Sequence, residues 1–407
     1  MTQRGRRVLW LALGLYIAAW GFGTDVMFPV AVGLALAPAA AWAWVRLLDR
    51  PMRLRRRAGH LELVEGQSFA VGLEVTADGG PLPGRAVVVD RVGETPVVTG
   101  VVRTGRVLRG RYEVASALRG RYRLGGAELV IGDGFGLAEA RIALDRSDEV
   151  IVYPRVYPLE GLFTDAGGAS GEQGRALLHR TAGYDLHSIR DHQQGESLRR
   201  VHWRSTAKRR KLMVKELQDT PRDEASVLLD GDARAVAGAA PESTFDYQVR
   251  AAASLLHRLL ESGQRSALVI HGAAHTRIRV GDSGGHWATA LGALAGAQAD
   301  APRTLAATLG ESAHAANRVD AARVFVVTAA MSAQLAERLL ALRSAQRDIA
   351  VVWVDAPDFA GNGADTAQNA AALRLTRSGI PMARIRQGDD VGRALSAPTL
   401  RLVVASA

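Results

Sequence analysis

The residues best suited to chemistry lie in one short segment, positions 183–217. It reads GYDLHSIRDHQQGESLRRVHWRSTAKRRKLMVKEL, an acid- and base-rich loop followed by an expected strand at 212–217. Three of its side chains, Asp191, Glu196 and His202, could act as general acids and bases. Histidines and aspartates of the region could instead bind a metal ion, although their spacing matches no standard zinc pattern. These residues are His179, Asp185, His187, Asp191, His192 and His202.

The same segment also has a purely structural interpretation. Arg190, Asp191, Glu196 and Arg200 can form ion pairs around Trp203, because an arginine can stack on the face of an indole ring. A paired carboxylate can also remain charged when it is partly buried. We therefore expect the segment to brace the chain or to form a partner-docking surface, in preference to a catalytic, metal or nucleic-acid site.

Two further patterns do not support the enzymes that they suggest. The run GDSGG at 281–285 matches the nucleophile motif of trypsin-like proteases, but His275 precedes Ser283 by only eight positions, in a region of α/β pattern. Asp282 or Ser283 is expected to be a turn residue or a helix cap. The glycine-rich stretch 166–174 lacks the Gly-Lys-Ser/Thr of a phosphate-binding loop and favours a flexible linker.

The chemistry-bearing segment resembles the signature of the DUF58 family. His192 and Lys208 depart from the family pattern, in which Tyr and Arg are usual, while the spacing is intact. Segments at 119–122, 132–136 and 152–154 also resemble family motifs, so the resemblance is expected to cover almost the whole chain. Because the function of the family is poorly defined, the resemblance implies architecture more than activity. The residues that carry the signature are Arg190, Asp191, His192, Gly195, Glu196, Arg200, His202, Trp203, Ser205, Ala207 and Lys208.

From residue 225 onward, short apolar strands alternate with helical patterns. This alternation is typical of a largely parallel, doubly wound α/β sheet. Together with the DUF58 resemblance, it makes the region similar to a von Willebrand factor A-type (vWA-like) domain. The expected strands are 226–229, 267–270, 324–327, 349–354 and 382–385, and the expected helices are 245–260, 287–294, 332–342 and 366–375.

Domains of that type often bind a divalent ion through Asp-x-Ser-x-Ser after the first strand. The matching positions here are Asp230, Asp232 and Arg234, so a cation replaces the last hydroxyl. After a later strand, Thr328 is followed by Ala329 where an aspartate is usual. An arginine repels a metal ion, so we expect a degenerate position with no Mg²⁺ and no other cofactor. Asp230 and Asp232 would then pair with Arg234 or with the basic signature.

The middle of the chain, residues 60–150, has alternating and β-branched runs separated by turn signals at short intervals. This spacing predicts an antiparallel, Ig-like β-sandwich. Two Arg-Gly-Arg-Tyr repeats, at 109–112 and 119–122, could indicate RNA binding. We expect instead that these arginines are solvated and that the tyrosines pack on the sheet.

Two uncharged apolar runs, 8–22 and 26–45, begin the chain. The second has about the length needed to cross a bilayer, and the first is shorter. Basic residues flank both outer ends, which by the positive-inside rule places both ends in the cytoplasm. A cleaved signal peptide is the alternative, but a second run follows at once. Tryptophans near the ends of the runs favour the membrane interface; they are Trp10, Trp20, Trp42 and Trp44.

Composition supports this organisation. The 407 residues include no cysteine, which excludes disulfides and thiol chemistry. The formal charge is +10, and residues 1–57 carry nine arginines against two aspartates, a local net charge of 9 − 2 = +7. This charge adjoins the apolar runs, which favours a membrane over nucleic acid. The predicted parts are a transmembrane hairpin (1–50), a β-sandwich (51–158), a linker with the signature (159–222) and a vWA-like domain (223–407).

These observations predict a cytosol-facing scaffold, anchored in the inner or plasma membrane by two passes, with no catalytic residues and no nucleic-acid partner. The family resemblance implies a MoxR-type AAA+ ATPase as partner, in an assembly or cell-envelope process. The alternative is an enzyme acting on envelope precursors at the inner membrane face, with Asp191, Glu196 and His202 as acid/base groups. A weaker alternative is lipid or nucleic-acid binding by the basic run 208–211.

Overall fold

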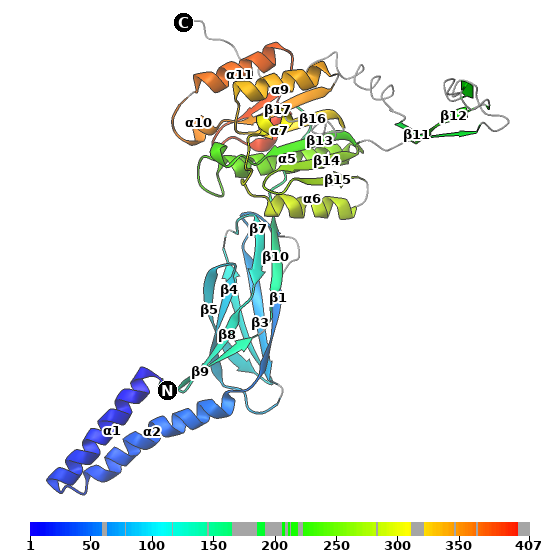
Figure 1. Ribbon diagram of the computed structural model, residues 1–407. Coiled ribbons are helices and arrows are strands. Elements are labelled where there is room, and N and C mark those ends of the chain that lie inside the picture. Colours follow the sequence, from blue (N-terminus) through cyan, green and yellow to red (C-terminus); the bar gives the residue numbers. More distant parts are fainter. Residues whose placement is uncertain are drawn as a thin grey trace. The chain divides into compact units, whose positions relative to one another are not determined.

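The structure is a computed structural model (Figure 1). It describes residues 1–58, 63–77, 79–115, 117–144, 146–164, 185–191, 206–207, 211, 213–218, 223–281, 284–310, 321–345, 347–363 and 365–397. The backbone alone is described at 58, 185–191, 213–218, 223–224 and 284–285. The chain divides into two units, Met1–Tyr153 and Pro154–Ala407.

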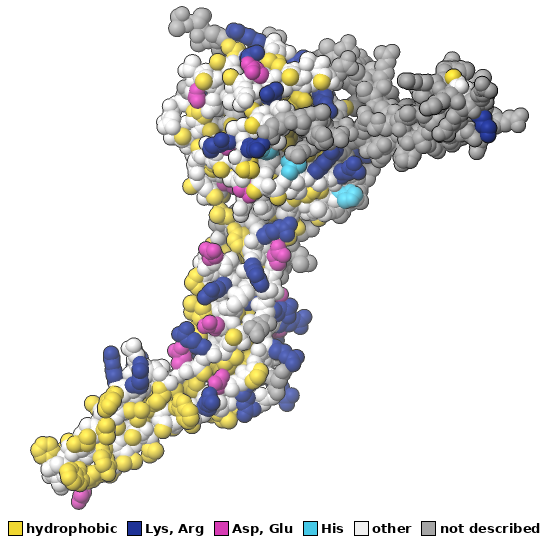
Figure 2. Space-filling model, viewed as in Figure 1, with side chains coloured by type: hydrophobic (Ala, Val, Ile, Leu, Met, Phe, Trp, Pro, Cys, Tyr) yellow, Lys and Arg dark blue, Asp and Glu magenta, His cyan; other side chains and the backbone are white. Residues whose placement is uncertain are grey.

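The first unit begins with a helical hairpin, α1 (Gln3–Phe22) and α2 (Met27–Leu48). The helices pack on each other, with Tyr16 edge-on to Phe28 at 5.3 Å between ring centroids. Figure 2 shows hydrophobic side chains exposed along both helices. Among the described residues, α2 is the one helix long and apolar enough to cross a bilayer. This finding supports one of the two predicted spans. Helix α1 does not meet the same criterion, because the arginines in its first turns shorten its uncharged stretch.

A large curled sheet follows the hairpin. Its strand order is β1-β3-β6-β5-β4-β7-β10-β2, with β8 paired to β4 and to β9. All pairs are antiparallel except β2 with β10. The strands are β1 (Met52–Ala58), β2 (Leu63–Val64), β3 (Phe69–Ala77), β4 (Arg85–Val92), β5 (Thr95–Thr104), β6 (Val107–Val114), β7 (Gly120–Leu124), β8 (Ala127–Gly132), β9 (Glu139–Leu144) and β10 (Asp148–Tyr153).

The alternation seen in the sequence sets the inner face of this sheet. Along β3, residues Phe69, Val71, Leu73 and Val75 are buried and the residues between them are not. The predicted β-rich, antiparallel domain is confirmed. Its strands belong to one hydrogen-bonded sheet and not to two separate ones, because β4 pairs with β5 on one side and with β7 and β8 on the other.

The connection from α2 to β1 is short. Only three residues separate Leu48 from Met52, and Leu48 is fully buried in the same apolar cluster as Val71 and Val88 of the sheet. The last residue of the helix therefore belongs to the core of the β domain.

The second unit contains a six-stranded sheet with the order β15-β14-β13-β16-β17-β18, parallel except for β15. Helices cover both faces: α5 and α12 belong to one core cluster, and α7, α9 and α11 to the other. The elements are β13 (Asp223–Asp230), η2 (Ala233–Ala235), α5 (Thr244–Glu261), β14 (Ser266–His271), β15 (Thr276–Val280), α6 (Gly284–Gly296), α7 (Leu305–Gly310), β16 (Ala321–Thr328), α9 (Ala333–Ser344), β17 (Asp348–Val354), α10 (Ala356–Phe359), α11 (Thr366–Arg377), β18 (Met382–Ile385) and α12 (Val391–Ser396).

Every strand and helix predicted for this α/β region is present. Five elements were not predicted, namely η2, β15, α7, α10 and α12. The strand predicted at 212–217 is β12 (Met213–Gln218), which pairs antiparallel with β11 (Asp185–Asp191). The expectation of a loop over 185–191 was therefore wrong: β12 supplies a pairing partner that the polar sequence of β11 does not reveal.

The first residues of the predicted linker (159–222) pack into the α/β core. Leu159 and Phe163 are buried there, and Phe163 lies edge-on to Phe325. The Phe163 amide donates a hydrogen bond to the Leu395 carbonyl at 2.8 Å.

Candidate functional site

The predicted signature is described only in small part. Arg190 and Asp191 lie on β11, opposite Val214 and Met213 of β12, and are described by their backbone. Ala207 is exposed. The predicted ion-pair network and the predicted acid/base and metal roles rest on side chains outside the described residues, so they stay predictions. The signature residues outside the described part of the chain are His192, Gly195, Glu196, Arg200, His202, Trp203, Ser205 and Lys208.

The other predicted acids, Asp230 and Asp232, lie at the carboxyl edge of the α/β sheet. Strand β13 runs between β14 and β16, and the chain continues from β13 to β14 on one side before it reaches β16 on the other. Ligands of such sheets bind where the connections diverge in this way. Asp230 ends β13 and Thr328 ends β16, and the Thr328 hydroxyl donates a hydrogen bond to Asp230 Oδ2 at 2.7 Å.

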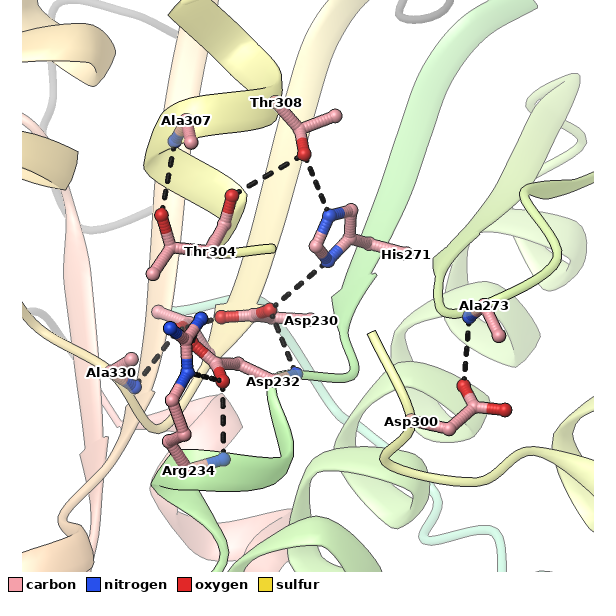
Figure 3. A network of polar contacts seen from close by, with 11 residues as sticks. Asp230, Asp232, Arg234, His271, Ala273, Asp300, Thr304, Ala307, Thr308 and Ala330 are labelled. Atoms are coloured by element: carbon pink, nitrogen blue, oxygen red, sulfur yellow. Dashed lines mark hydrogen bonds and ion pairs between the residues drawn. The ribbon is translucent and has the colours of Figure 1, made fainter. Parts of the chain in front are cut away.

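Asp230 is 3% exposed and is held on several sides. Its Oδ1 accepts a hydrogen bond from the Asp232 amide at 3.2 Å and lies 3.4 Å from Nδ1 of His271. The other ring nitrogen, Nε2, lies 2.9 Å from the hydroxyl of Thr308. Figure 3 shows the imidazole between the aspartate and α7. The carboxylate is therefore fixed within the protein and does not face solvent.

Asp232 is engaged by an arginine two positions later. Arg234 donates from Nε to Oδ1 at 2.8 Å and from Nη2 to Oδ2 at 3.0 Å, and its backbone amide also donates to Oδ1. Figure 3 shows the guanidinium lying along the carboxylate. Hydrogen bonding to Asp232 and its negative charge raise the pKa of Arg234. The Asp232 side chain is 4% exposed and that of Arg234 is 63% exposed, so the pair joins a buried acid to a cation on the surface.

A glycine between the two acids permits this arrangement. The Gly231 amide donates to the His271 carbonyl at 2.8 Å, and its own carbonyl accepts from the Ala301 amide at 2.9 Å. A Cβ at position 231 would lie 2.4 Å from the His271 carbonyl oxygen. Only glycine allows the chain to pass this close to the end of β14.

These contacts bear on metal binding. Both oxygens of Asp232 accept from Arg234, and both oxygens of Asp230 accept hydrogen bonds within the protein. No group of three or more acidic or histidine side chains suited to a metal occurs within the described residues. A divalent ion here would have to displace the Arg234 guanidinium, so the donor set does not fit a resident Mg²⁺.

The order Thr308, His271, Asp230 is that of a hydroxyl–imidazole–carboxylate triad. The geometry does not favour a nucleophile, because the threonine hydroxyl also donates at 3.3 Å to the carbonyl of Thr304, the residue directly before its own helix. The depression beside this network is lined by Arg234, by 235–237 and by residues of 356–368, and by none of the three triad-like residues. The threonine therefore lacks an adjoining substrate pocket in this depression.

Sequence reasoning found part of this site. It singled out Asp230, Asp232, Arg234 and Thr328, and the expected pairing of Asp232 with Arg234 is present. His271 was not predicted, although it ends the strand next to β13 and so falls at the same edge of a parallel sheet. Thr308 gave no signal, because the short helix α7 was not predicted.

The second unit is thus an α/β unit with two acids, Asp230 and Asp232, at the carboxyl edge of its sheet. A comparison with protein families finds a match that covers this part of the chain. A family model described as "Protein of unknown function DUF58" matches residues 188–360. This confirms the expected resemblance over less than half of the chain; the motifs at 119–122, 132–136 and 152–154 lie outside the match.

One curated relative is an uncharacterized protein, YeaD, from Bacillus subtilis (strain 168). It is 24% identical over 190 residues, which are 47% of this chain and 46% of the relative. The chain therefore spans about half the length of that relative.

Two of the solved structures that match this chain have low TM-scores to it. A conjugative transposon lipoprotein from Bacteroides eggerthii has a TM-score of 0.16 at 11% identity, covering 25% of this chain and 96% of its own. Cwp6 from Clostridium difficile has a TM-score of 0.18 at 8% identity, covering 80% of this chain and 39% of its own. Neither score indicates a shared fold.

Proposed function

We propose that this protein is a membrane-anchored, non-catalytic scaffold whose vWA-like α/β domain binds a protein partner at the carboxyl edge of its sheet. The observation that carries the proposal is the Asp232–Arg234 pair, in which an arginine takes the place of a metal ion at the position where such sheets bind ligands. The proposed partner, a MoxR-type AAA+ ATPase in an assembly or envelope-related process, comes from the family resemblance.

Arg234 is suited to bind a carboxylate of the partner. A guanidinium has five N–H donors, and Asp232 engages one on Nε and one on Nη2. Because the side chain is 63% exposed, its outer donors can reach an acidic side chain on another protein. Asp232 fixes the guanidinium in advance, which reduces the entropy lost on binding.

The membrane part of the proposal rests on α2 and its surroundings. This helix passes the length and composition test for a span, and its apolar side chains Leu36 and Trp42 are 61% and 52% exposed. Arg4, Arg6 and Arg7 precede the first uncharged run, and arginines from position 46 onward follow the second. This distribution supports two passes with the bulk of the chain in the cytoplasm.

A binding measurement tests the docking surface. The full-length protein in lipid nanodiscs is titrated with the purified MoxR-type ATPase of the same organism. Arg234→Glu should weaken binding by about tenfold or more, since a charged hydrogen bond is lost and a repulsive charge is introduced. The matched control is Arg323→Ala, which removes an arginine paired with Asp348 at 2.7 Å near the amino ends of β16 and β17, at the opposite edge of the same sheet. Equal binding by both variants would exclude the carboxyl edge as the docking surface.

The signature segment is tested in the same assay. An Arg190→Ala/Trp203→Ala variant with an unchanged melting temperature should lose the partner if the signature contributes to the interface. If this folded variant binds the partner as well as the unaltered protein does, the segment braces the chain or carries the alternative enzymatic function, with Asp191, Glu196 and His202 as its acid/base groups.

A further inference from the structure

The turn between β8 and β9 exposes a phenylalanine. Phe135 is 83% exposed, and no described large apolar side chain is more exposed. Its neighbours Leu137 and Ala138 are buried at 8% and 2%. The sequence around it, Gly132-Asp133-Gly134-Phe135-Gly136, is one of the motifs that resemble DUF58 proteins, and nothing in the proposed function uses it.

The backbone of this turn is fixed. The Asp133 carboxylate accepts hydrogen bonds from the Phe135 amide at 2.9 Å and the Ala138 amide at 2.6 Å. Burial by itself raises the pKa of Asp133. The backbone hydrogen bonds together lower it by more than burial raises it, so the pKa of Asp133 lies below its ordinary value. The carboxylate is therefore charged near neutral pH and holds the turn that presents the phenylalanine.

The turn is also fastened to both helices of the hairpin. The Thr2 amide donates to the Leu137 carbonyl at 3.0 Å, and the Thr2 hydroxyl donates to the Gly136 carbonyl at 2.6 Å. A Cβ at Gly5 of α1 would lie 2.2 Å from the Leu137 carbonyl oxygen, so the close approach requires glycine. Apolar side chains of the two helices and of the β8–β9 region also pack together in one cluster at this contact. They are Val8, Ala41, Val45, Leu137, Ala138 and Ala140.

This contact lies where the charged and uncharged parts of the helices meet. Val8 and Val45, which both belong to the cluster, are the first and last residues of the two uncharged runs, next to Arg7 and Arg46. The stretch from Met27 to Val45 would span about 28 Å as a helix, close to the hydrocarbon thickness of a bilayer. The turn is therefore level with one bilayer surface if α2 spans the membrane.

We propose that Phe135 inserts into the headgroup region of the bilayer and that the β8–β9 turn is a lipid-contacting loop. This proposal rests on the proposed membrane anchoring. An aromatic side chain is favourable at that depth, and Trp42 and Trp44 of α2, 52% and 51% exposed, lie beside the same cluster residues. The nearby arginines Arg4 and Arg46 carry the charge that attracts anionic headgroups. Through this loop the β domain is held to the bilayer surface at a second point besides its helix connection.

The absence of cysteine in the chain allows a direct test. Single cysteines replace Phe135, Leu36 in the middle of α2, or Val98 of β5, all of which are exposed. Val98 pairs with Val89, which pairs with Glu128, so it lies about 16 Å along the strand direction from the turn. Each full-length variant carries a fluorescent label and is reconstituted into vesicles of phosphatidylcholine and phosphatidylglycerol. Lipids with a nitroxide in the headgroup or deep in the acyl chain quench the label according to its depth.

The expected result is quenching at 135 by headgroup nitroxides, at 36 by deep nitroxides, and at 98 by neither, with melting temperatures equal to that of the unaltered protein. Quenching at 36 with none at 135 would overturn the lipid-contacting loop and leave the anchor intact. No quenching at 36 would refute the membrane span itself, and the loop proposal with it.

Discussion

Two arginine–carboxylate pairs with the same forked geometry lie in different surroundings. In the β domain, Arg56 donates to both oxygens of Asp90 at 2.9 and 2.8 Å, and the two side chains are 1% and 0% exposed. At the edge of the α/β sheet, Arg234 binds Asp232 at 2.8 and 3.0 Å, and its own side chain is 63% exposed. One pair is closed within a core, and the other has an open side.

The interior pair is part of a completed network. The Tyr112 hydroxyl donates to Asp90 at 2.9 Å, and Nη1 of Arg56 donates to the Arg146 carbonyl and to Asp148 at 2.8 and 3.1 Å. Burial alone would lower the pKa of Arg56, but hydrogen bonding and charge from Asp90 and Asp148 raise it overall. For Tyr112, burial first and then the charge of Asp90 raise the pKa.

The difference shows how one chemical unit serves two purposes. Where its polar groups are satisfied inside the protein, the ion pair fixes the positions of β1, β4 and β6 and presents nothing to a partner. Where one side of the guanidinium is exposed, the buried acid orients a cation for a second carboxylate.

The largest expected effect is in the interior network. Arg56→Met leaves the buried Asp90 carboxyl without its cation, with Tyr112 and a backbone amide as remaining donors. We expect the free energy of unfolding to fall by about 3–5 kcal/mol, measured by urea denaturation of the full-length protein in detergent. The triple variant Arg56→Met/Asp90→Leu/Tyr112→Phe should recover most of the loss, because an apolar replacement needs no partner. If it is as unstable as the single variant, the charged groups are not the cause.

A smaller loss is expected from the loop that presents the edge pair. Gly231→Ala places a methyl group against the His271 carbonyl and should lower the free energy of unfolding by about 1–3 kcal/mol, as overpacking does. Gly281→Ala is the matched control, because a Cβ there meets no atom within 4 Å. Similar melting temperatures for the two variants would mean that the backbone around position 231 shifts to accommodate the methyl group without loss of stability.

The interior network should also respond to alkali. The folded protein keeps the Tyr112 proton above the ordinary tyrosine pKa of 10.0, whereas the unfolded chain releases it. The contribution of Tyr112 to the free energy of unfolding is therefore fully present below pH 10.0. Above that pH it declines by about 1 kcal/mol for each pH unit, until the raised pKa of Tyr112 in the folded protein is reached. Urea unfolding at about pH 9 and about pH 11 should show a smaller decline in Tyr112→Phe than in the unaltered protein. An equal decline would assign the alkaline sensitivity to other groups.

The smallest effect is expected at the exposed arginine. Arg234→Ser should leave the melting temperature nearly unchanged, because a surface ion pair contributes little to stability. Added Mg²⁺ should not change the melting temperature of the unaltered protein, and it should raise that of Arg234→Ser, in which Asp232 is free and a hydroxyl is restored. A rise of equal size in both proteins would show that the arginine does not exclude the ion.

Much of the fold could be predicted from local periodicity. The α/β strands are short apolar runs flanked by helical patterns, and each was found to within a few residues. β15 was missed because Arg277 and Arg279 interrupt its apolar pattern at the edge of the sheet. The curling of the β domain into one sheet depends on pairings between distant strands, which periodicity does not encode.

The sites were less predictable, because their partners come from distant parts of the chain. Arg56 was counted among the cations flanking the membrane, although Met52, Leu54 and Arg56 alternate toward the core. Asp90 occupies an equivalent inward position on β4. These two inward-facing charges of opposite sign, on an otherwise apolar face, could have predicted the buried ion pair. The pairing of Asp232 with Arg234 could be anticipated because they are two residues apart.

The burial of Leu48 in the β-domain core has a mechanical consequence. The three residues between α2 and β1 end in Pro51, whose backbone torsion is restricted, so the connection has little freedom to swivel. Torque on the β domain would therefore be transmitted to α2, and a tilt of α2 would turn the domain with it. A fragment cut at residue 51 would lose both this coupling and a side chain of its own core.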